Sequence, residues 1–86
     1  MALVLTDRFR RAYQRLPADI QRKVKKALRL LDEDVNYPGL HVHKIQGTDA
    51  IYEGRVDHKY RFSFSFSGDD IVLRNVDNHD ECLNSP

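Results

Sequence analysis

The chain has 86 residues, of which 41% are hydrophobic and 31% charged, a composition typical of a globular protein and not of a disordered one. This length predicts a single domain over residues 1–86, with a thin core that a protein partner would stabilise. The one cysteine, Cys82, excludes an internal disulfide, and the sequence has neither a signal-peptide pattern nor an apolar run long enough to span a membrane. We therefore expect a cytoplasmic protein without a membrane partner.

The net charge of +1 hides an uneven distribution of charged side chains along the chain. Residues 1–30 carry nine basic and two acidic side chains, whereas residues 31–86 carry five basic and eleven acidic ones. Such an asymmetry is typical of proteins that bind a polyanion or an acidic partner. The alternative is that these charges only solvate the outer faces of helices.

The first third of the chain predicts two amphipathic helices. Thr6 or Asp7 is suited to cap the first helix, and Pro17 ends it and is also suited to the first turn of the second. Helical spacing relates two sets of apolar residues: Phe9, Ala12, Tyr13 and Leu16, then Ile20, Val24, Ala27, Leu28 and Leu31. The acidic run 32–34 opposes the helix dipole, so the second helix should end there. The short link predicts a helical hairpin.

From Ile51 onward the hydrophobic pattern has a period of two. It predicts strands over residues 51–56, 60–66 and 71–76, with shorter candidates at 3–5 and 41–45. In the middle strand aromatic residues alternate with arginine and serine, so one face should pack on the helices and the other should be open to water. The predicted fold is α+β, with a two-helix hairpin packed on one face of a small, mostly antiparallel, twisted sheet.

The polar face of this predicted sheet holds the residues best suited to chemistry. Arg55 and Arg61 fall on neighbouring strands, and guanidinium groups bind phosphodiesters through a fixed fork of donors. Glu53 shares this face, and His79 follows the last strand, where a histidine is suited to proton transfer near neutrality. The alternative is that Arg61 pairs with Glu53 or Asp77 across the sheet and that His79 is an ordinary surface histidine.

Other features carry weaker signals. His41 and His43 alternate around Val42, but one such pair far from the only cysteine is weak evidence for a metal, so we expect none. Cys82 has no strongly basic neighbour other than His79, which predicts an inert thiol. The glycines are scattered and form no phosphate-binding loop, and we expect no cofactor.

Four segments together resemble the RelE/ParE toxin superfamily of toxin–antitoxin modules along nearly the whole chain. They are FRRAYQRLPADIQRKVKKAL (9–28), YPGLHVHKIQG (37–47), IYEGRVDHKYRFSFSF (51–66) and IVLRNVDNHDECL (71–83). The most specific pieces are the turn at His43–Gly47, the Tyr60-Arg61 pair and the closing His79-Asp80-Glu81. Their order and spacing together carry the resemblance.

The resemblance implies a toxin of a type II toxin–antitoxin module. RelE-like members are metal-independent endoribonucleases that cut ribosome-bound mRNA, leave a cyclic phosphate and inhibit translation. The implied partners are a cognate antitoxin, the ribosome and mRNA. Two alternatives remain: a ParE-like toxin that inhibits a topoisomerase by binding it, and a toxin-like domain that keeps only antitoxin binding.

The resemblance also implies roles for individual residues. Arg61 would hold the scissile phosphate with help from Arg55, His79 would transfer a proton, and Glu53 is a candidate second acid or base. Leu83 stands where many nuclease members carry an aromatic residue. The residues expected to contact nucleic acid are the loop lysine and three basic residues of the second predicted helix: Lys44, Arg22, Lys23 and Lys26. We interpret the basic helix residues as part of a docking surface for ribosomal RNA or an acidic antitoxin.

Overall fold

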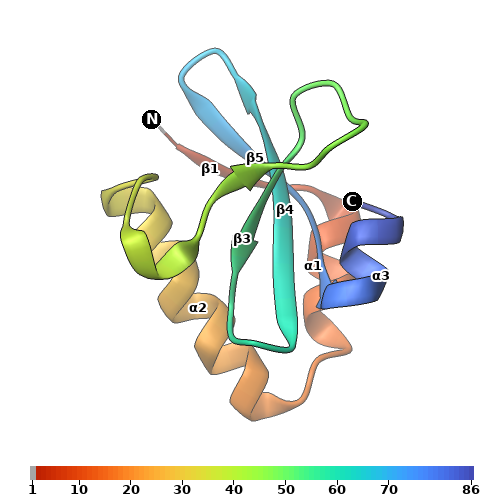
Figure 1. The fold of residues 1–86 in the computed structure, drawn as a ribbon. Helices are drawn as coiled ribbons and strands as arrows, with labels where there is room; N and C mark the ends of the chain where they lie inside the picture. The colour runs from red at the N-terminus through yellow and green to blue at the C-terminus, as the bar shows by residue number, and fades with distance from the viewer. Residues whose placement is uncertain (1) are drawn as a thin grey trace.

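The computed structural model describes residues 2–86, which fold into a five-stranded sheet with helices (Figure 1). The strand order is β1-β5-β4-β3-β2, with β1 parallel to β5 and every other pair antiparallel. The elements are β1 (Leu3–Leu5), α1 (Asp7–Gln14), α2 (Ala18–Glu33), the 3-10 helix η1 (Pro38–Leu40), β2 (His43–Lys44), β3 (Tyr52–Arg55), β4 (Tyr60–Ser67), β5 (Asp70–Asn78) and α3 (His79–Asn84). The predicted α+β fold is therefore confirmed.

Both predicted helices are present, although α1 already ends at Gln14, before the predicted stop at Pro17. The Thr6 hydroxyl accepts a hydrogen bond from the Phe9 N–H at 3.1 Å, so Thr6 caps α1. Pro17 immediately precedes α2, and Asp34 ends it in an extended conformation. None of the helices within residues 2–86 is long and apolar enough to cross a membrane.

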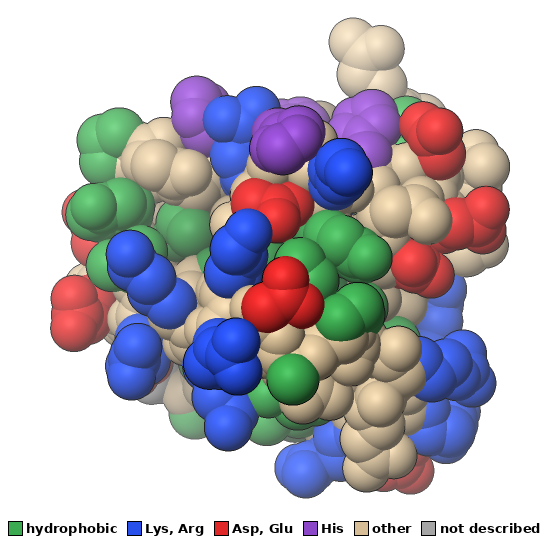
Figure 2. Space-filling model, turned by 90° about the horizontal axis from the view of Figure 1, so that it is seen from below, with side chains coloured by type: hydrophobic (Ala, Val, Ile, Leu, Met, Phe, Trp, Pro, Cys, Tyr) green, Lys and Arg blue, Asp and Glu red, His purple; other side chains and the backbone are tan. Residues whose placement is uncertain are grey.

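The basic residues of the helices lie on their outward faces. Arg22, Lys23, Lys25 and Lys26 of α2 are all exposed, whereas Val24 between them is fully buried. Seen from below, the molecule carries Lys and Arg side chains over much of its surface (Figure 2). The amphipathic pattern thus separates a basic outer face from an apolar inner face.

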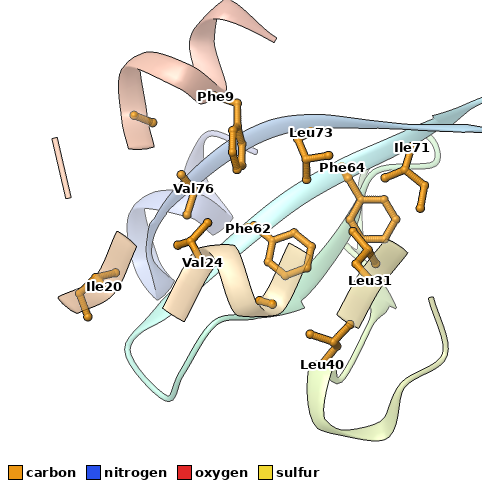
Figure 3. Close-up of a cluster of buried hydrophobic side chains, with 12 residues drawn as sticks. Phe9, Ile20, Val24, Leu31, Leu40, Phe62, Phe64, Ile71, Leu73 and Val76 are labelled. Atoms are coloured by element: carbon orange, nitrogen blue, oxygen red, sulfur yellow. The ribbon is translucent and has the colours of Figure 1, made fainter. Parts of the chain in front are cut away.

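The core lies between α1, α2 and one face of the sheet. Phe62 and Phe64 point from β4 toward Val24 and Leu31 of α2, and Phe9 adds a ring from α1 (Figure 3). All five of these side chains are at most 1% exposed. Burying such large apolar side chains contributes about 1.5–3 kcal/mol each before entropy is counted.

The expectation that the whole aromatic row of β4 faces the core is wrong at its end. Phe66, near the end of β4, is 46% exposed, although its partner Ile71 on β5 is fully buried. Its ring instead packs edge-on against Tyr52 and Phe64, with ring centres 5.3 and 5.6 Å apart. The aromatic row therefore continues onto the surface.

The expectation of a polar face open to water is also only partly correct. Ser63 on this face is fully buried and Asn75 is 7% exposed, because the short helix α3 covers them. The Asn75 side chain donates a hydrogen bond to the Ser85 carbonyl oxygen at 2.9 Å, which fixes the end of α3 on the sheet. Only the part of this face beyond α3 remains accessible.

Candidate active site

A cavity of about 280 Å³ opens on the accessible part of the polar face. Its lining residues come from β2 and the segment before it, from β3, from β4 and from the start of α3: His41, His43, Glu53, Gly54, Arg55, Arg61 and His79. In Figure 2 histidine side chains gather along one border of the molecule beside Lys and Arg side chains. The four residues predicted from the sequence to be catalytic therefore all line one cavity: Glu53, Arg55, Arg61 and His79.

Two arginines face each other across the strand pair at the centre of this cavity. Arg55 on β3 and Arg61 on β4 are directly paired in the sheet register, so their side chains share a face. Arg61 Nη1 donates to the Tyr60 carbonyl oxygen at 2.9 Å and also to the Asp57 carbonyl oxygen, and the side chain is only 12% exposed. Backbone contacts thus hold Arg61 in place.

The two arginines differ in what else they contact. Arg61 Nε lies 3.9 Å from Glu53 Oε1, so the alternative of an Arg61–Glu53 ion pair is present as a long contact. Asp77 lies opposite Arg61 in the register but forms no ion pair with it. Within residues 2–86, no carboxylate lies within ion-pair distance of Arg55. Arg55 is therefore the guanidinium most available to an incoming anion.

Glu53 and His43 lie side by side in the cavity. His43 Nδ1 lies 2.9 Å from the His41 carbonyl oxygen, which can only accept, so Nδ1 carries a hydrogen. His43 Nε2 lies 3.5 Å from Glu53 Oε1. The pair is suited to acid–base chemistry.

The residue two positions before His43, His41, has a strained backbone conformation. His41 has a φ of 48°, in the left-handed region that a residue with a Cβ seldom adopts. It follows the 3-10 helix η1, and its N–H donates to the Pro38 carbonyl oxygen at 3.2 Å. Strained backbone of this kind concentrates at functional sites, and here it aims the His41 carbonyl group at His43.

His79 closes the cavity from the other side. It is the first residue of α3, its backbone N–H donates to the Lys59 carbonyl oxygen at 2.7 Å, and its side chain is 47% exposed. Its Nδ1 lies 3.4 Å from Asp80 Oδ1, a contact too long to lock the ring. The imidazole is therefore anchored through its backbone and can exchange protons with a ligand or with solvent.

Below the cavity lies a group of buried polar atoms. Glu53 is 2% exposed, and within residues 2–86 neither its Oε2 nor the Ser63 hydroxyl has a partner in good hydrogen-bond geometry. The neighbouring thiol of Cys82 is at best a weak partner. Burial, and after it the nearby Glu53 carboxylate, raises the pKa of Cys82 to about 12, while the Ser63 hydroxyl lowers it slightly. The thiol is thus protonated at neutral pH.

We expect iodoacetamide at pH 8 to leave Cys82 unmodified in the folded protein, because only a thiolate reacts at an appreciable rate. In urea the same thiol should be alkylated readily. Since unfolding allows this group to ionise near its ordinary pKa of 9.0, the free energy of unfolding should fall as the pH rises from 9 toward 12. Equal alkylation rates in the folded and unfolded protein, measured by mass spectrometry, would contradict this account.

The residues expected to contact nucleic acid occupy different surfaces. Lys23 and Lys26 line a second cavity that adjoins the first at Arg55. Lys44 and Arg22 are exposed but line neither cavity, and Lys44 alternates with His43, so it points away from the first one. Two of the four expected residues thus adjoin the site, and two lie apart from it.

Leu83 is 44% exposed on α3 and does not line the cavity. His41 and His43 are lining residues that sequence reasoning considered only as metal ligands. Their alternation placed both histidines on one face of the predicted strand 41–45. The sequence did not show that the corresponding strand, β2, pairs with β3 at Glu53. No group of three or more histidine, cysteine, aspartate or glutamate side chains among residues 2–86 has the arrangement of metal ligands.

Solved structures that resemble this chain include toxins. The toxin of the RelB–RelE antitoxin–toxin complex from Methanococcus jannaschii superimposes with a TM-score of 0.77 at 22% identity, over 96% of this chain and 99% of that one. The YoeB/ParE toxin from Agrobacterium tumefaciens gives 0.74 at 21% identity, over 92% and 99%. YafQ from E. coli strain BL21(DE3) gives 0.77 at 11% identity, over 92% and 93%.

These likenesses establish that the chain has the RelE-like toxin fold, as the resemblance in sequence predicted. In sequence comparisons, no protein-family model and no curated protein matches the chain. The fold therefore rests on structure, and the chemistry must be argued from the residues of the cavity.

Proposed function

We propose that this chain is the toxin of a toxin–antitoxin module and that it acts in the cytoplasm as a metal-independent endoribonuclease on ribosome-bound mRNA, thereby inhibiting translation. The observation that supports this most is the order of groups across the sheet. His43 on β2, Arg55 on β3, Arg61 on β4 and His79 after β5 follow one another around a single cavity. Two cations thus lie between two groups able to transfer protons.

This order matches the needs of RNA cleavage by the 2′-hydroxyl. A base removes the proton of that hydroxyl, the oxygen attacks phosphorus, the bond to the 5′ oxygen breaks, and an acid protonates the leaving oxygen. The products are a 2′,3′-cyclic phosphate and a 5′-hydroxyl. Arg55 and Arg61 would stabilise the pentacoordinate phosphate through charge-assisted hydrogen bonds. The His43–Glu53 pair and His79 would provide the two proton transfers.

An antitoxin is the expected protein partner. Two adjoining grooves between β1, α1 and α2 are lined by apolar residues with a basic rim; they share Leu28 and Lys25. Their further apolar lining residues are Leu3, Leu5, Phe9 and Tyr13. An amphipathic segment with acidic flanks would bury this apolar surface and neutralise the rim. The similarity to a solved RelB–RelE antitoxin–toxin complex supports an antitoxin as the partner.

Pulse labelling in cells that express the chain tests the proposal. Protein synthesis should stop within minutes while DNA synthesis continues, and replacing His79 by alanine should restore growth. The matched control is His58→Ala, because His58 is an exposed histidine of the β3–β4 turn that does not line the cavity. An early stop in DNA synthesis would instead indicate ParE-like topoisomerase inhibition and would overturn the nuclease proposal.

A further inference from the structure

A second cavity of about 350 Å³ adjoins the first, between α2, η1 and the end of β3. Arg55 lines both cavities, and within residues 2–86 no carboxylate pairs with its guanidinium. A strand whose phosphate lies on Arg55 in the first cavity can therefore continue into the second. The second cavity is thus placed to receive the residue of a polymer that follows or precedes the reacting one.

The second cavity carries positive charge. Lys23, Lys26 and Arg55 contribute three cations, and the one carboxylate among its lining residues is Asp57. Lys23 Nζ lies 3.1 Å from Asp57 Oδ2, and the backbone N–H groups of Lys59 and Tyr60 donate to Oδ1 at 2.9 and 2.8 Å. Although burial alone raises the pKa of Asp57, these hydrogen bonds hold it below its ordinary value. Asp57 and Lys23 therefore engage each other, and Lys26 and Arg55 leave the cavity with net positive charge.

An exposed aromatic ring completes the second cavity. Tyr37 is 42% exposed, although its backbone is fixed: its N–H donates to the Asp34 carbonyl oxygen and its carbonyl oxygen accepts from the Leu40 N–H, both at 3.0 Å. The edge of the ring lies against Gly39, where a Cβ would come within 2.9 Å of Tyr37 Cε2. Leu30 and Leu40 add apolar wall. An aromatic plane beside cations is the combination that binds single-stranded nucleic acid.

We propose that this second cavity binds the nucleotide next to the scissile phosphate, with its base stacked on Tyr37 and its phosphate held by Lys26. The inference rests on the proposed function, since it takes the phosphate on Arg55 as the reacting one. A free mononucleotide would fill only one of the two cavities. The occupant is therefore single-stranded RNA that spans both.

The test measures binding of a short oligoadenylate in which every ribose is 2′-O-methylated, so that no hydroxyl is available for cleavage. Tyr37→Ala should weaken binding by about 10-fold or more, because stacking of one base on an aromatic side chain has that value. Tyr37→Phe should bind as the wild type does. Phe66→Ala, the loss of another exposed aromatic that does not line this cavity, should also leave binding unchanged. NMR ring-current shifts on the Tyr37 ring should accompany binding.

A further variant moves the ring without removing it. Gly39→Ala should displace Tyr37 and weaken binding while the protein stays folded. Binding by Tyr37→Ala equal to that of the wild type, absence of any binding, or equally tight binding of free AMP would each overturn the inference. If Tyr37→Ala loses binding but the wild type leaves mRNA intact in growing cells that express it, the nucleotide site stands and the nuclease proposal falls. If cleavage and binding both ignore Tyr37, the nuclease stands and the site falls.

Discussion

Replacing Arg55 by alanine should lower RNA cleavage by about 100-fold or more and, at the same time, make the protein more stable. The loss of activity follows because a positioned cation that stabilises developing charge contributes about that factor. The gain in stability follows from the register, since Arg55 and Arg61 are like charges placed directly opposite each other. We expect the free energy of unfolding to rise by about 0.5 kcal/mol, measured by urea denaturation.

The matched control for this variant is Arg74→Ala. Arg74 is on β5, where its Nε donates to the Pro86 carbonyl oxygen at 3.3 Å, and it does not line the cavity. Its replacement should leave cleavage unchanged and should not stabilise the protein. Arg61→Ala should also abolish cleavage, but it should destabilise the fold because Arg61 holds two backbone carbonyl groups. A less stable Arg55→Ala variant, or one that cleaves normally, would contradict the assigned role.

Replacing Gly54 by alanine should produce the largest loss of stability. Gly54 lies opposite Phe62 in the register, and a Cβ there would come within 2.6 and 2.8 Å of Phe62 Cε1 and Cε2 and still closer to Cζ. Phe62 is fully buried, so its ring has no free space into which it can move. Such overpacking costs about 2–3 kcal/mol. In a domain of this size that lowers Tm by about 10 °C or more, which calorimetry will measure.

Two further variants test the cause of this loss. Gly39→Ala places its Cβ against the end of the exposed Tyr37 ring, which can move, so its Tm should stay near that of the wild type. Combining Gly54→Ala with Phe62→Leu should cost less than the sum of the single changes, because the smaller side chain leaves room for the Cβ. Strict additivity would show that the ring contact is not the cause.

Local patterns in the sequence predicted the framework of the fold. The caps at Thr6 and Pro17, the helical spacing of the apolar residues and the alternation in β4 each depend on neighbours in the chain. The polar-face alternation was enough to bring Arg55, Arg61 and Glu53 together, because antiparallel hairpins fix which residues face each other. These parts of the site followed from short-range rules.

The rest of the site depends on contacts between distant segments. Helix α3 buries Ser63 and places His79 at the cavity, and the prediction did not include it, although Asn78 three residues before Glu81 is a capping signal. The pairing of β2 with β3 brings His43 to Glu53, but two strand residues are too few for a pattern to specify a partner. The exposure of Phe66 and the left-handed conformation of His41 likewise depend on the three-dimensional arrangement of the elements around them, and no local sequence pattern indicates either.

Primer extension on mRNA from cells that express the wild-type chain or the Arg55→Ala variant tests the central claim most directly. Our account predicts new 5′ ends at a fixed position within codons for the wild type, and no such ends for Arg55→Ala at an equal protein level. Intact mRNA in growth-arrested wild-type cells, or identical cuts with Arg55→Ala, would contradict the claim that this cavity cleaves RNA.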